Sequence, residues 1–205
     1  MSSQELQSRG ILPPVLPPVN RPLPEFVVRD LTLRLGQPGD IDAIVGYYSR
    51  NQEYLGRFSA PVNSKWLGRE FWGPRVEEMH ASFRDDKACN FFMFDDKRRV
   101  VGVINLSNAI RGAFHCCTLG YGLDQDLQGR GLMTEALKVA IRYAFEEKNF
   151  HRIEANYQPK NLKSENILRK LGFIEEGLAQ SYLYINGIWE PHMKTSLTNQ
   201  NWRPT

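Results

Sequence analysis

The chain has 205 residues, of which 26 are lysine or arginine and 23 are aspartate or glutamate, giving a formal charge of +3. This length suits one domain that can bury a core without disulfide staples. The mild positive charge permits an anionic cofactor but excludes the dense basic stripe of a dedicated nucleic-acid-binding protein. Only three cysteines are present, two of them adjacent, which implies no disulfide framework and favours a reducing compartment, so we expect a cytoplasmic location.

The N-terminal segment, residues 1–25, is expected to form a unit of its own, because six of the prolines fall within twelve positions there. Its first residues lack the basic and apolar regions of a signal peptide. No apolar run in the chain reaches the length of a membrane span. Apolar residues between the prolines leave two alternatives open, an arm docked on the domain surface or a loose tail. The second expected unit is residues 26–205.

The first elements of this second unit are a strand and two helices. Residues 31–35 alternate apolar and polar side chains, which predicts a half-buried strand. Residues 41–48 have apolar residues at helical spacing, after a helix-start signal at Asp40. A second helix is expected from about Asn63, and Pro74 is expected to break or restart it.

A group of strands and the strongest helix signal follow. Residues 90–94, 100–106 and 114–123 read as three strands with short connections, which predicts an antiparallel meander. Residues 132–147 carry one continuous apolar face with charged residues opposite, the pattern of a long amphipathic helix.

The remaining elements complete the fold prediction. We expect a strand at residues 151–157, a short helix at 164–171, and strands at 182–185 and 189–197 joined by the turn signal Asn186-Gly187. The resulting order, β-α-α-β-β-β-α-β-α-β-β, predicts an α/β (α+β) fold. In this fold a mixed, mostly antiparallel sheet is flanked by helices on both faces.

A glycine turn lies between the third strand of the meander and the long helix. Gly129 and Gly131 let the backbone approach a ligand, and their amides stand at the N-terminus of the helix, where an anion such as a pyrophosphate is favoured. An ordinary strand-to-helix turn is the alternative reading. The turn is not a P-loop, since no Lys-Ser/Thr pair follows, and it lacks the third glycine of a dinucleotide-binding fingerprint.

Two later segments, taken together with the glycine turn, resemble a known superfamily. Asn161-Leu-Lys-Ser164 and the closing Leu171-Gly-Phe173, together with the glycine turn, resemble the GNAT N-acetyltransferase superfamily, whose members bind acetyl-CoA at such a turn. Further segments, from about residue 27 to the Asn201-Trp-Arg-Pro end, are similar to the RimJ/RimL-type ribosomal-protein N-terminal-alanine acetyltransferases. They include Leu119-Gly-Tyr121, Gln128-Gly-Arg-Gly-Leu-Met133, His151-Arg-Ile153, Ala155-Asn-Tyr157 and Asn186-Gly-Ile-Trp189.

The resemblance implies a GNAT-like sheet and an acetyl-CoA site without a metal. The backbone of Tyr121, Gly122 and Leu123 would lie against the pantetheine arm. Asn161 would reach the same arm, or serve as a helix N-cap. The sequence departs from the usual pattern at Asp126, where relatives have Gln or Arg. The residues implied to cradle the pyrophosphate are Gln128, Gly129, Arg130, Gly131, Leu132, Met133 and Thr134.

The resemblance also implies direct attack of an amine on the thioester, which needs proton transfer at two places. Ser164 is the candidate proton donor to the leaving thiolate, and a plain first-turn serine is the alternative. Relatives carry a catalytic glutamate at the position of Asn156, which cannot accept a proton. Glu154 is therefore the candidate base, acting through a water, and an ion pair with Arg152 is the alternative reading for its carboxylate.

The expected function is acetyl transfer from acetyl-CoA to the N-terminal α-amine of a protein. The resemblance points to the N-terminal alanine of a small-subunit ribosomal protein. Two alternatives stay open, acetylation of a small-molecule amine and a CoA-binding or ribosome-associated module without catalysis. We expect a protein N-terminus as partner, with ribosome association as an option, no membrane, and a monomer or homodimer.

Overall fold

The computed structural model describes residues 23–58 and 64–204, so the choice between docked arm and loose tail lies outside the described part for residues 1–22. The described strands form one eight-stranded sheet in the order β1-β2-β3-β4-β5-β6-β8-β7. All neighbouring strands are antiparallel except β5 and β6, which are parallel. In chain order the strands are β1 (Glu25–Val28), β2 (Leu31–Leu35), β3 (Cys89–Phe94), β4 (Val100–Ile110), β5 (Cys116–Leu123), β6 (Arg152–Glu154), β7 (Ile174–Ile185) and β8 (Ile188–Thr198).

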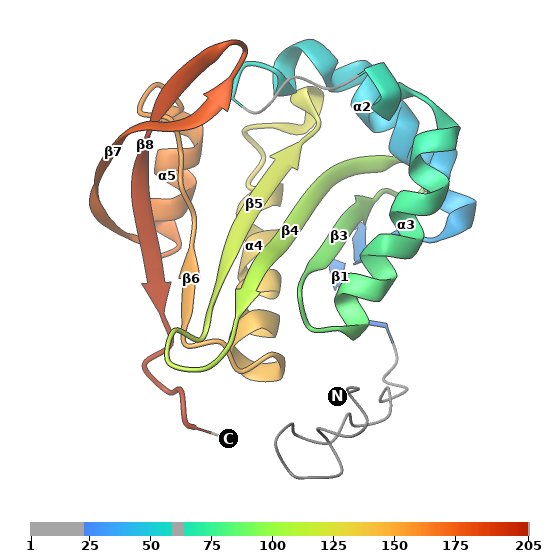
Figure 1. Cartoon of the computed structure of the whole chain (residues 1–205). Coiled ribbons are helices and arrows are strands. Elements are labelled where there is room, and N and C mark those ends of the chain that lie inside the picture. The colour runs from blue at the N-terminus through green and yellow to red at the C-terminus, as the bar shows by residue number, and fades with distance from the viewer. Residues whose placement is uncertain (1–22, 59–63, 205) are drawn as a thin grey trace, which may run out of the picture.

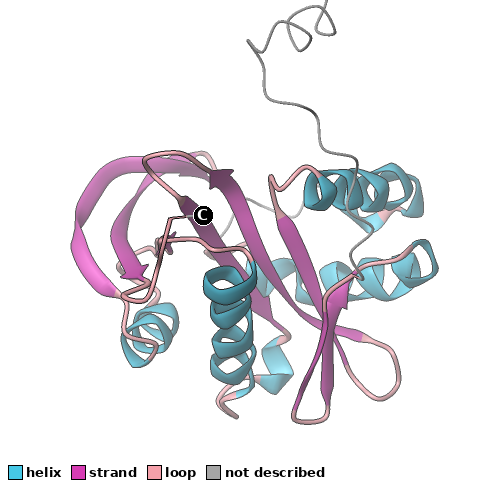
Figure 2. Cartoon of the chain, turned by 90° about the horizontal axis from the view of Figure 1, so that it is seen from below, coloured by secondary structure: helices cyan, strands magenta, loops and turns pink. Residues whose placement is uncertain are grey.

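Helices lie on both sides of this curved sheet (Figures 1 and 2). Helices α2 and α3 pack on the face of β3 and β4, and helix α4 packs on the opposite face. The helices are α2 (Ile41–Leu55), α3 (Arg69–Arg84), α4 (Leu132–Arg142), which continues as a π-helical turn (Tyr143–Glu147), and α5 (Leu162–Lys170). None of the helices in the described ranges is long and apolar enough to cross a membrane.

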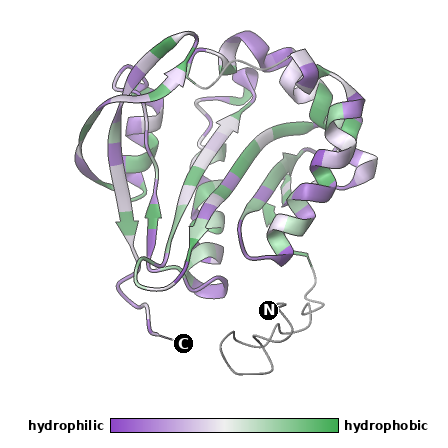
Figure 3. Ribbon diagram, in the orientation of Figure 1, coloured by the Kyte–Doolittle hydropathy of each residue, from purple (hydrophilic) through white to green (hydrophobic). Residues whose placement is uncertain are grey.

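The two faces of the sheet hold separate apolar cores. The larger one lies under α4 and includes Leu137, Ile153 and Leu168, all of them buried. The smaller one lies under α2 and α3, where the rings of Tyr48 and Trp72 stack with their centroids 5.1 Å apart. Figure 3 shows β4 as largely hydrophobic, whereas polar residues lie along the outer sides of α2 and α3.

The predicted fold class is confirmed, and so are several individual elements. Strands β3, β4 and β5 form the expected antiparallel meander. Helix α4 with its π-helical extension spans the predicted residues 132–147. The Asn186-Gly187 turn joins β7 to β8, with both residues at positive φ (51° and 83°), as a two-residue hairpin of the type I′ kind requires.

Other elements differ from the prediction. Strand β1 was not expected, since its four residues are too short for a pattern. Strand β7 begins at Ile174 rather than at residue 182, and its early start was missed because the exposed residues there show no apolar alternation. Strand β6 is shorter than predicted. The expected break at Pro74 is wrong, because Pro74 lies inside α3. It is the sixth residue of that helix, and the Glu70 carbonyl that loses its intrahelical donor there belongs to an exposed residue that water can reach.

The sheet has an opening between β5 and β6, and the candidate site lies there. Strands β5 and β6 pair only from Cys116–Arg152 to Thr118–Glu154. Beyond this point β5 continues to Leu123, whereas the chain after β6 diverges from β5 and stays paired with β8 on its other edge. Figure 1 shows the two strands close together at one end and separated at the other.

Candidate active site

The far half of β5 presents a backbone edge to this opening. Residues 119–123 pair with β4 on one side, and the structure records no partner strand for them among the described residues on the other. An edge of this kind can hydrogen-bond an extended ligand that carries amide groups. The expected contacts of Tyr121, Gly122 and Leu123 with a pantetheine arm require such an edge.

The glycine turn opens at the N-terminus of α4. Gly129 and Gly131 have φ values of 74° and 75°, in the left-handed region that favours glycine. A Cβ atom on Gly129 would meet nothing within 4 Å, so the backbone there faces open space. The backbone amides of Gly129, Arg130 and Gly131 have no recorded hydrogen-bond partner among the described residues. The turn therefore fits an anion, which its amides and the dipole of α4 would bind.

Three cationic side chains lie around the same turn. Arg29 Nη1 donates to the Arg130 carbonyl at 3.0 Å, and Arg130 Nη2 donates to the Asp126 carbonyl at 3.2 Å. Lys163 Nζ, from α5, donates to Gln128 Oε1 at 2.6 Å. All three cations are exposed, so they can add charge to a bound pyrophosphate.

No role for Arg29 or Lys163 was predicted from the sequence. Arg29 lies in the turn between β1 and β2, about a hundred residues before the glycine turn, and no local pattern connects the two. Lys163 lies within the Asn161–Ser164 segment that was recognised, so its neighbourhood was a signal that could have been followed.

The first turn of α5 forms the other wall of the opening. Asn161 is the N-cap of this helix, because its Oδ1 accepts a hydrogen bond from the Ser164 amide at 3.2 Å. The Tyr121 hydroxyl, from β5, donates to the Ser164 carbonyl at 3.5 Å, and burial raises the pKa of Tyr121 to about 12. The cap role of Asn161 leaves its Nδ2 available for a ligand. The Ser164 side chain also lies within hydrogen-bonding reach of the Tyr121 hydroxyl.

Strand alternation assigns the two faces of β5. A Cβ on Gly122 would lie 2.9 Å from the Tyr47 hydroxyl, so Gly122 faces α2. Gly120 and Thr118 share that face by period two. A Cβ on Gly120 would meet nothing within 4 Å, which leaves room on this face, away from α4.

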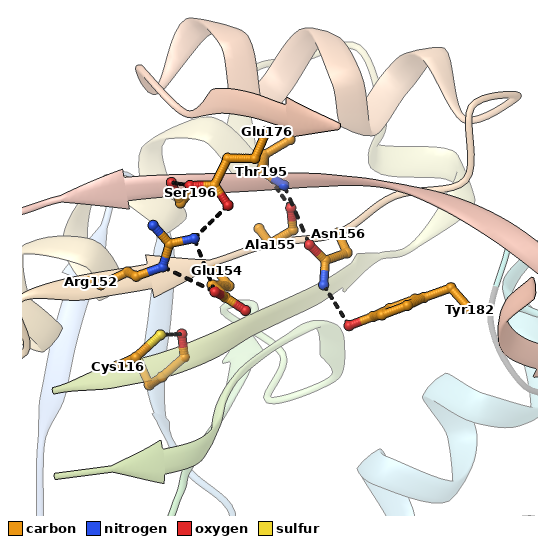
Figure 4. Close-up of polar contacts among 10 residues, drawn as sticks. Cys116, Arg152, Glu154, Ala155, Asn156, Glu176, Tyr182, Thr195 and Ser196 are labelled. Carbon is orange, nitrogen blue, oxygen red and sulfur yellow. Dashed lines mark hydrogen bonds and ion pairs between the residues drawn. The ribbon is translucent and has the colours of Figure 1, made fainter. Parts of the chain in front are cut away.

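Glu154 lies beside this open space, in an ion-paired cluster (Figure 4). It is the register partner of Thr118, and Arg152 Nε donates to its carboxylate at 3.0 Å. Arg152 also pairs with Glu176 at 2.6 Å, and Ser196 Oγ donates to the same carboxylate at 2.7 Å. The hydrogen bonds from Arg152 and Ser196 lower the pKa of Glu176 to about 2. The ion pair expected as the alternative for Glu154 is thus present.

The two candidate catalytic residues come from opposite walls of the opening. Glu154 ends β6, whereas Ser164 lies in the first turn of α5. Asn156 hydrogen-bonds to Tyr182 of β7, a residue to which the sequence analysis gave no role. Among the described residues, no three His, Cys, Asp or Glu side chains are grouped so that they could hold a metal ion.

Comparison with known proteins identifies the family of the chain. The chain is 38% identical over 186 residues to the ribosomal protein uS5-alanine N-acetyltransferase of Escherichia coli (strain K12). This match covers 90% of this chain and 96% of that protein. The crystal structure of ribosomal-protein-S5-alanine acetyltransferase from Vibrio fischeri matches with a TM-score of 0.86 at 35% identity, over 88% of this chain and 100% of that one. Mycobacterium smegmatis RimJ in complex with CoA-disulfide matches with a TM-score of 0.79 at 25% identity, over 89% and 90%.

The family assignment rests on the match to the Escherichia coli protein and on a match to a domain family. Residues 30–174 match the family described as an acetyltransferase (GNAT) domain. These residues run from the turn that carries Arg29 through β5, the glycine turn, α4 and α5 to the start of β7. The resemblance inferred from the sequence is confirmed, and the chain belongs to the GNAT family of N-acetyltransferases.

Proposed function

We propose that the protein transfers the acetyl group of acetyl-CoA to the N-terminal α-amine of a ribosomal protein, with an N-terminal alanine as the preferred acceptor. The observation that carries the proposal is the glycine turn, whose amides have no recorded partner in the described part of the chain. It lies beside the edge of β5 that no described strand covers. The acceptor is inferred from the relatives, since the Escherichia coli and Vibrio fischeri proteins are both named for an alanine of this kind. A cytoplasmic location would give access to that acceptor.

The cofactor site assigns separate tasks to the residues around the opening. The amides of the turn and the first turn of α4, residues 128–134, would hold the pyrophosphate, and Arg29 and Lys163 would add charge. The free edge of β5 would orient the pantetheine arm, with Asn161 opposite it. Acetyl-CoA supplies the acetyl group as a reactive thioester, which an amine can attack directly.

This division of tasks can be tested by binding. Arg29→Ala should weaken acetyl-CoA binding about tenfold, because a charge-assisted contact to a phosphate is lost. Lys170→Ala is the matched control, since Lys170 lies in the last turn of α5 and outside the set of contacts at the turn. Isothermal titration calorimetry at two salt concentrations measures both variants. Equal affinities for the two variants would remove Arg29 from the site.

The protonation state of the acceptor agrees with an α-amine. An α-amine with a pKa of about 7.7–8.0 is neutral in roughly a tenth of molecules near pH 7, whereas a lysine with a pKa of about 10.4 is neutral in well under a thousandth. Glu154 is already engaged by Arg152, so it is poorly placed to deprotonate a strongly basic amine by itself. It would take the proton of an α-amine through a water.

Ser164 is the proposed proton donor to the departing thiolate. Its side chain lies within hydrogen-bonding reach of the Tyr121 hydroxyl, and its backbone is fixed by Asn161 and Tyr121. Ser164→Ala should therefore slow turnover while acetyl-CoA binding stays unchanged, because the helix cap uses the backbone of Ser164 alone. An unchanged kcat would exclude this role.

One experiment distinguishes the candidate functions. The full-length protein is incubated with acetyl-CoA and with Ala-, Ser- or Thr-starting peptides, an N-terminally blocked lysine peptide, or spermidine. Thiol release and product mass are followed. We expect acetylation of the α-amine, fastest for the Ala-starting peptide. Acetylation of lysine or spermidine alone would overturn the N-terminal assignment, and acetyl-CoA binding without turnover on any acceptor would favour a binding module.

We also propose residues 26–205 as the catalytic unit. The family match begins at residue 30, and β1 begins at Glu25 and pairs with β2. Removal of residues 1–22, which leaves β1 intact, should therefore preserve folding and acetyl-CoA binding. A truncated protein that no longer binds acetyl-CoA would place part of the N-terminal segment in the catalytic unit.

A further inference from the structure

A β-bulge directs Tyr182 toward the open face of the sheet. The register of β7 with β8 shifts between Ala179–His192 and Leu183–Glu190, so three residues of β7 lie opposite Pro191 alone. Proline has no amide hydrogen and cannot donate to the ladder, which is why bulges form at such positions. Ser181, within the bulge, has a φ of 47°, a conformation that a serine rarely adopts.

The bulge places the Tyr182 hydroxyl against Asn156. Asn156 Nδ2 lies 3.0 Å from the Tyr182 oxygen, and Figure 4 shows the amide and the hydroxyl pointing toward each other. The ring of Tyr182 also contacts the ring of the buried His192, with centroids 5.4 Å apart. Tyr182 nevertheless keeps 36% of its surface exposed, so its hydroxyl is fixed and accessible at once.

The other side of the Asn156 amide sets the direction of this hydrogen bond. Asn156 Oδ1 accepts from the Thr195 backbone amide at 3.4 Å. A backbone N–H can only donate, so the amide oxygen must face Thr195 and the NH₂ group must face Tyr182. The Tyr182 oxygen is therefore the acceptor, and its own hydrogen remains free to donate toward the open face.

This free donor fits a group that a peptide N-terminus carries and a simple amine lacks. The first peptide bond places a carbonyl oxygen three bonds from the α-amine nitrogen. Lysine side chains and polyamines have no acceptor at that position. Asn156 follows Glu154 by two residues on the same face, so the hydroxyl lies on the side of the sheet where Gly120 leaves open space.

We propose that the Tyr182 hydroxyl donates a hydrogen bond to the first peptide carbonyl of the acceptor and thereby selects peptide N-termini over amines without that carbonyl. This rests on the proposed function. It also assigns a consequence to Asn156. A carboxylate at position 156 would accept the tyrosine hydrogen, whereas the amide leaves that hydrogen available for the acceptor.

Tyr182→Phe tests the proposal with two acceptors in the full-length protein. The first is an Ala-starting hexapeptide, and the second is the same peptide with a trans-alkene in place of the first peptide bond, which keeps the shape and removes the carbonyl. We expect Tyr182→Phe to lower kcat/KM for the hexapeptide by about 10- to 100-fold, because a buried hydrogen bond in the complex is lost. For the alkene analogue the two proteins should agree within about twofold.

Two further variants control for folding and ring packing. Tyr184→Phe removes a hydroxyl from the same strand, where the ring lies against Trp189, and should leave both acceptors unaffected. Asn156→Asp should reproduce the loss on the hexapeptide with Tyr182 intact, because the carboxylate takes up the tyrosine hydrogen. Thermal unfolding and acetyl-CoA binding of every variant should match wild type.

The outcomes distinguish a failure of the proposed function from a failure of the role of Tyr182. Wild-type protein that binds acetyl-CoA but acetylates no peptide overturns the proposed function, and this inference with it. Active wild type with equal losses for Tyr182→Phe on both acceptors, or with no loss on the hexapeptide, overturns the role of Tyr182 alone.

Discussion

The Tyr47 hydroxyl offers a direct test of packing beside the site. Tyr47 is completely buried in α2, and its hydroxyl has no hydrogen-bond partner among the described residues. Burial raises the pKa of Tyr47, so the hydroxyl stays neutral and its hydrogen stays in place. A buried hydroxyl without a partner costs about 1–3 kcal/mol. We therefore expect Tyr47→Phe to raise the free energy of unfolding by about 1 kcal/mol, or the melting temperature by roughly 2–4 °C.

Gly122 lies next to the Tyr47 hydroxyl, so substitutions at these two positions can be combined in a double-mutant cycle. A Cβ at Gly122 would lie 2.9 Å from the Tyr47 hydroxyl oxygen and 3.3 Å from Leu55 Cδ2. Overpacking of this kind costs about 1–3 kcal/mol, so Gly122→Ala should destabilise the wild type by that amount. Tyr47→Phe removes the closest atom, and the Leu55 methyl group can shift by a few tenths of an ångström. The cycle should therefore give a coupling energy of about 1–2 kcal/mol.

Urea unfolding of the four proteins measures the cycle. A lower free energy of unfolding for Tyr47→Phe would show that the hydroxyl has a partner, such as a bound water. Strictly additive effects would show that the alanine methyl group does not meet the hydroxyl. Either result would refute the packing described for α2 against β5.

Three further predictions concern buried charge, acid stability and the α5 cap. Asp40→Ala should lower the free energy of unfolding by about 3–5 kcal/mol in urea titrations, because it leaves the partly buried Arg34 without the buried carboxylate that it contacts at 2.7 Å. Loss of Glu53, whose ion pair is exposed, should cost less than about 1 kcal/mol. The pKa of Glu176 is lowered to about 2 from 4.5, so its contribution to stability is present above pH 4.5 and is lost as the pH falls toward 2. Glu176→Gln should therefore lose less thermal stability than wild type between about pH 5 and 2.5. Parallel curves of melting temperature against pH for the two proteins would contradict this role of Glu176. Asn161→Ala should destabilise the protein by about 1 kcal/mol whereas Asn161→Ser should not, and weaker acetyl-CoA binding in both variants would separate a ligand contact from the cap.

The parts of the fold that could be predicted are those set by local chemistry. The apolar periodicity of residues 132–147 and the Asn186-Gly187 turn each reflect neighbours in the chain, and the structure agrees with both. Asn161 was recognised as an N-cap candidate from its residue type and position, and it does cap α5. In each case a single conformational preference acts over a few residues.

The missed features depend on partners far away in sequence. Strand β1 has only four residues and becomes a strand through pairing with β2. Arg29 reaches the glycine turn only because that hairpin lies beside the start of α4. Tyr182 is directed by a bulge opposite Pro191, and the bulge is visible only once the register of β7 on β8 is known. No pattern within any one of these segments contains the information.

The candidate catalytic residues Ser164 and Glu154 fall between these two cases. The motif placed Ser164 on α5 and Glu154 on β6, and the structure puts them on opposite walls of one opening. The opening begins where the parallel pairing ends, at Thr118–Glu154. The chain after β6 stays paired with β8, and no further partner for that edge of β5 is recorded among the described residues. Backbone amides without partners are unfavourable in a buried setting. A ligand that carries amides in an extended arm and phosphates at one end matches both the strand edge and the glycine turn beside it. The β5 edge therefore lacks strand hydrogen bonds at one place among the described residues, and we propose that the cofactor and the acceptor meet there.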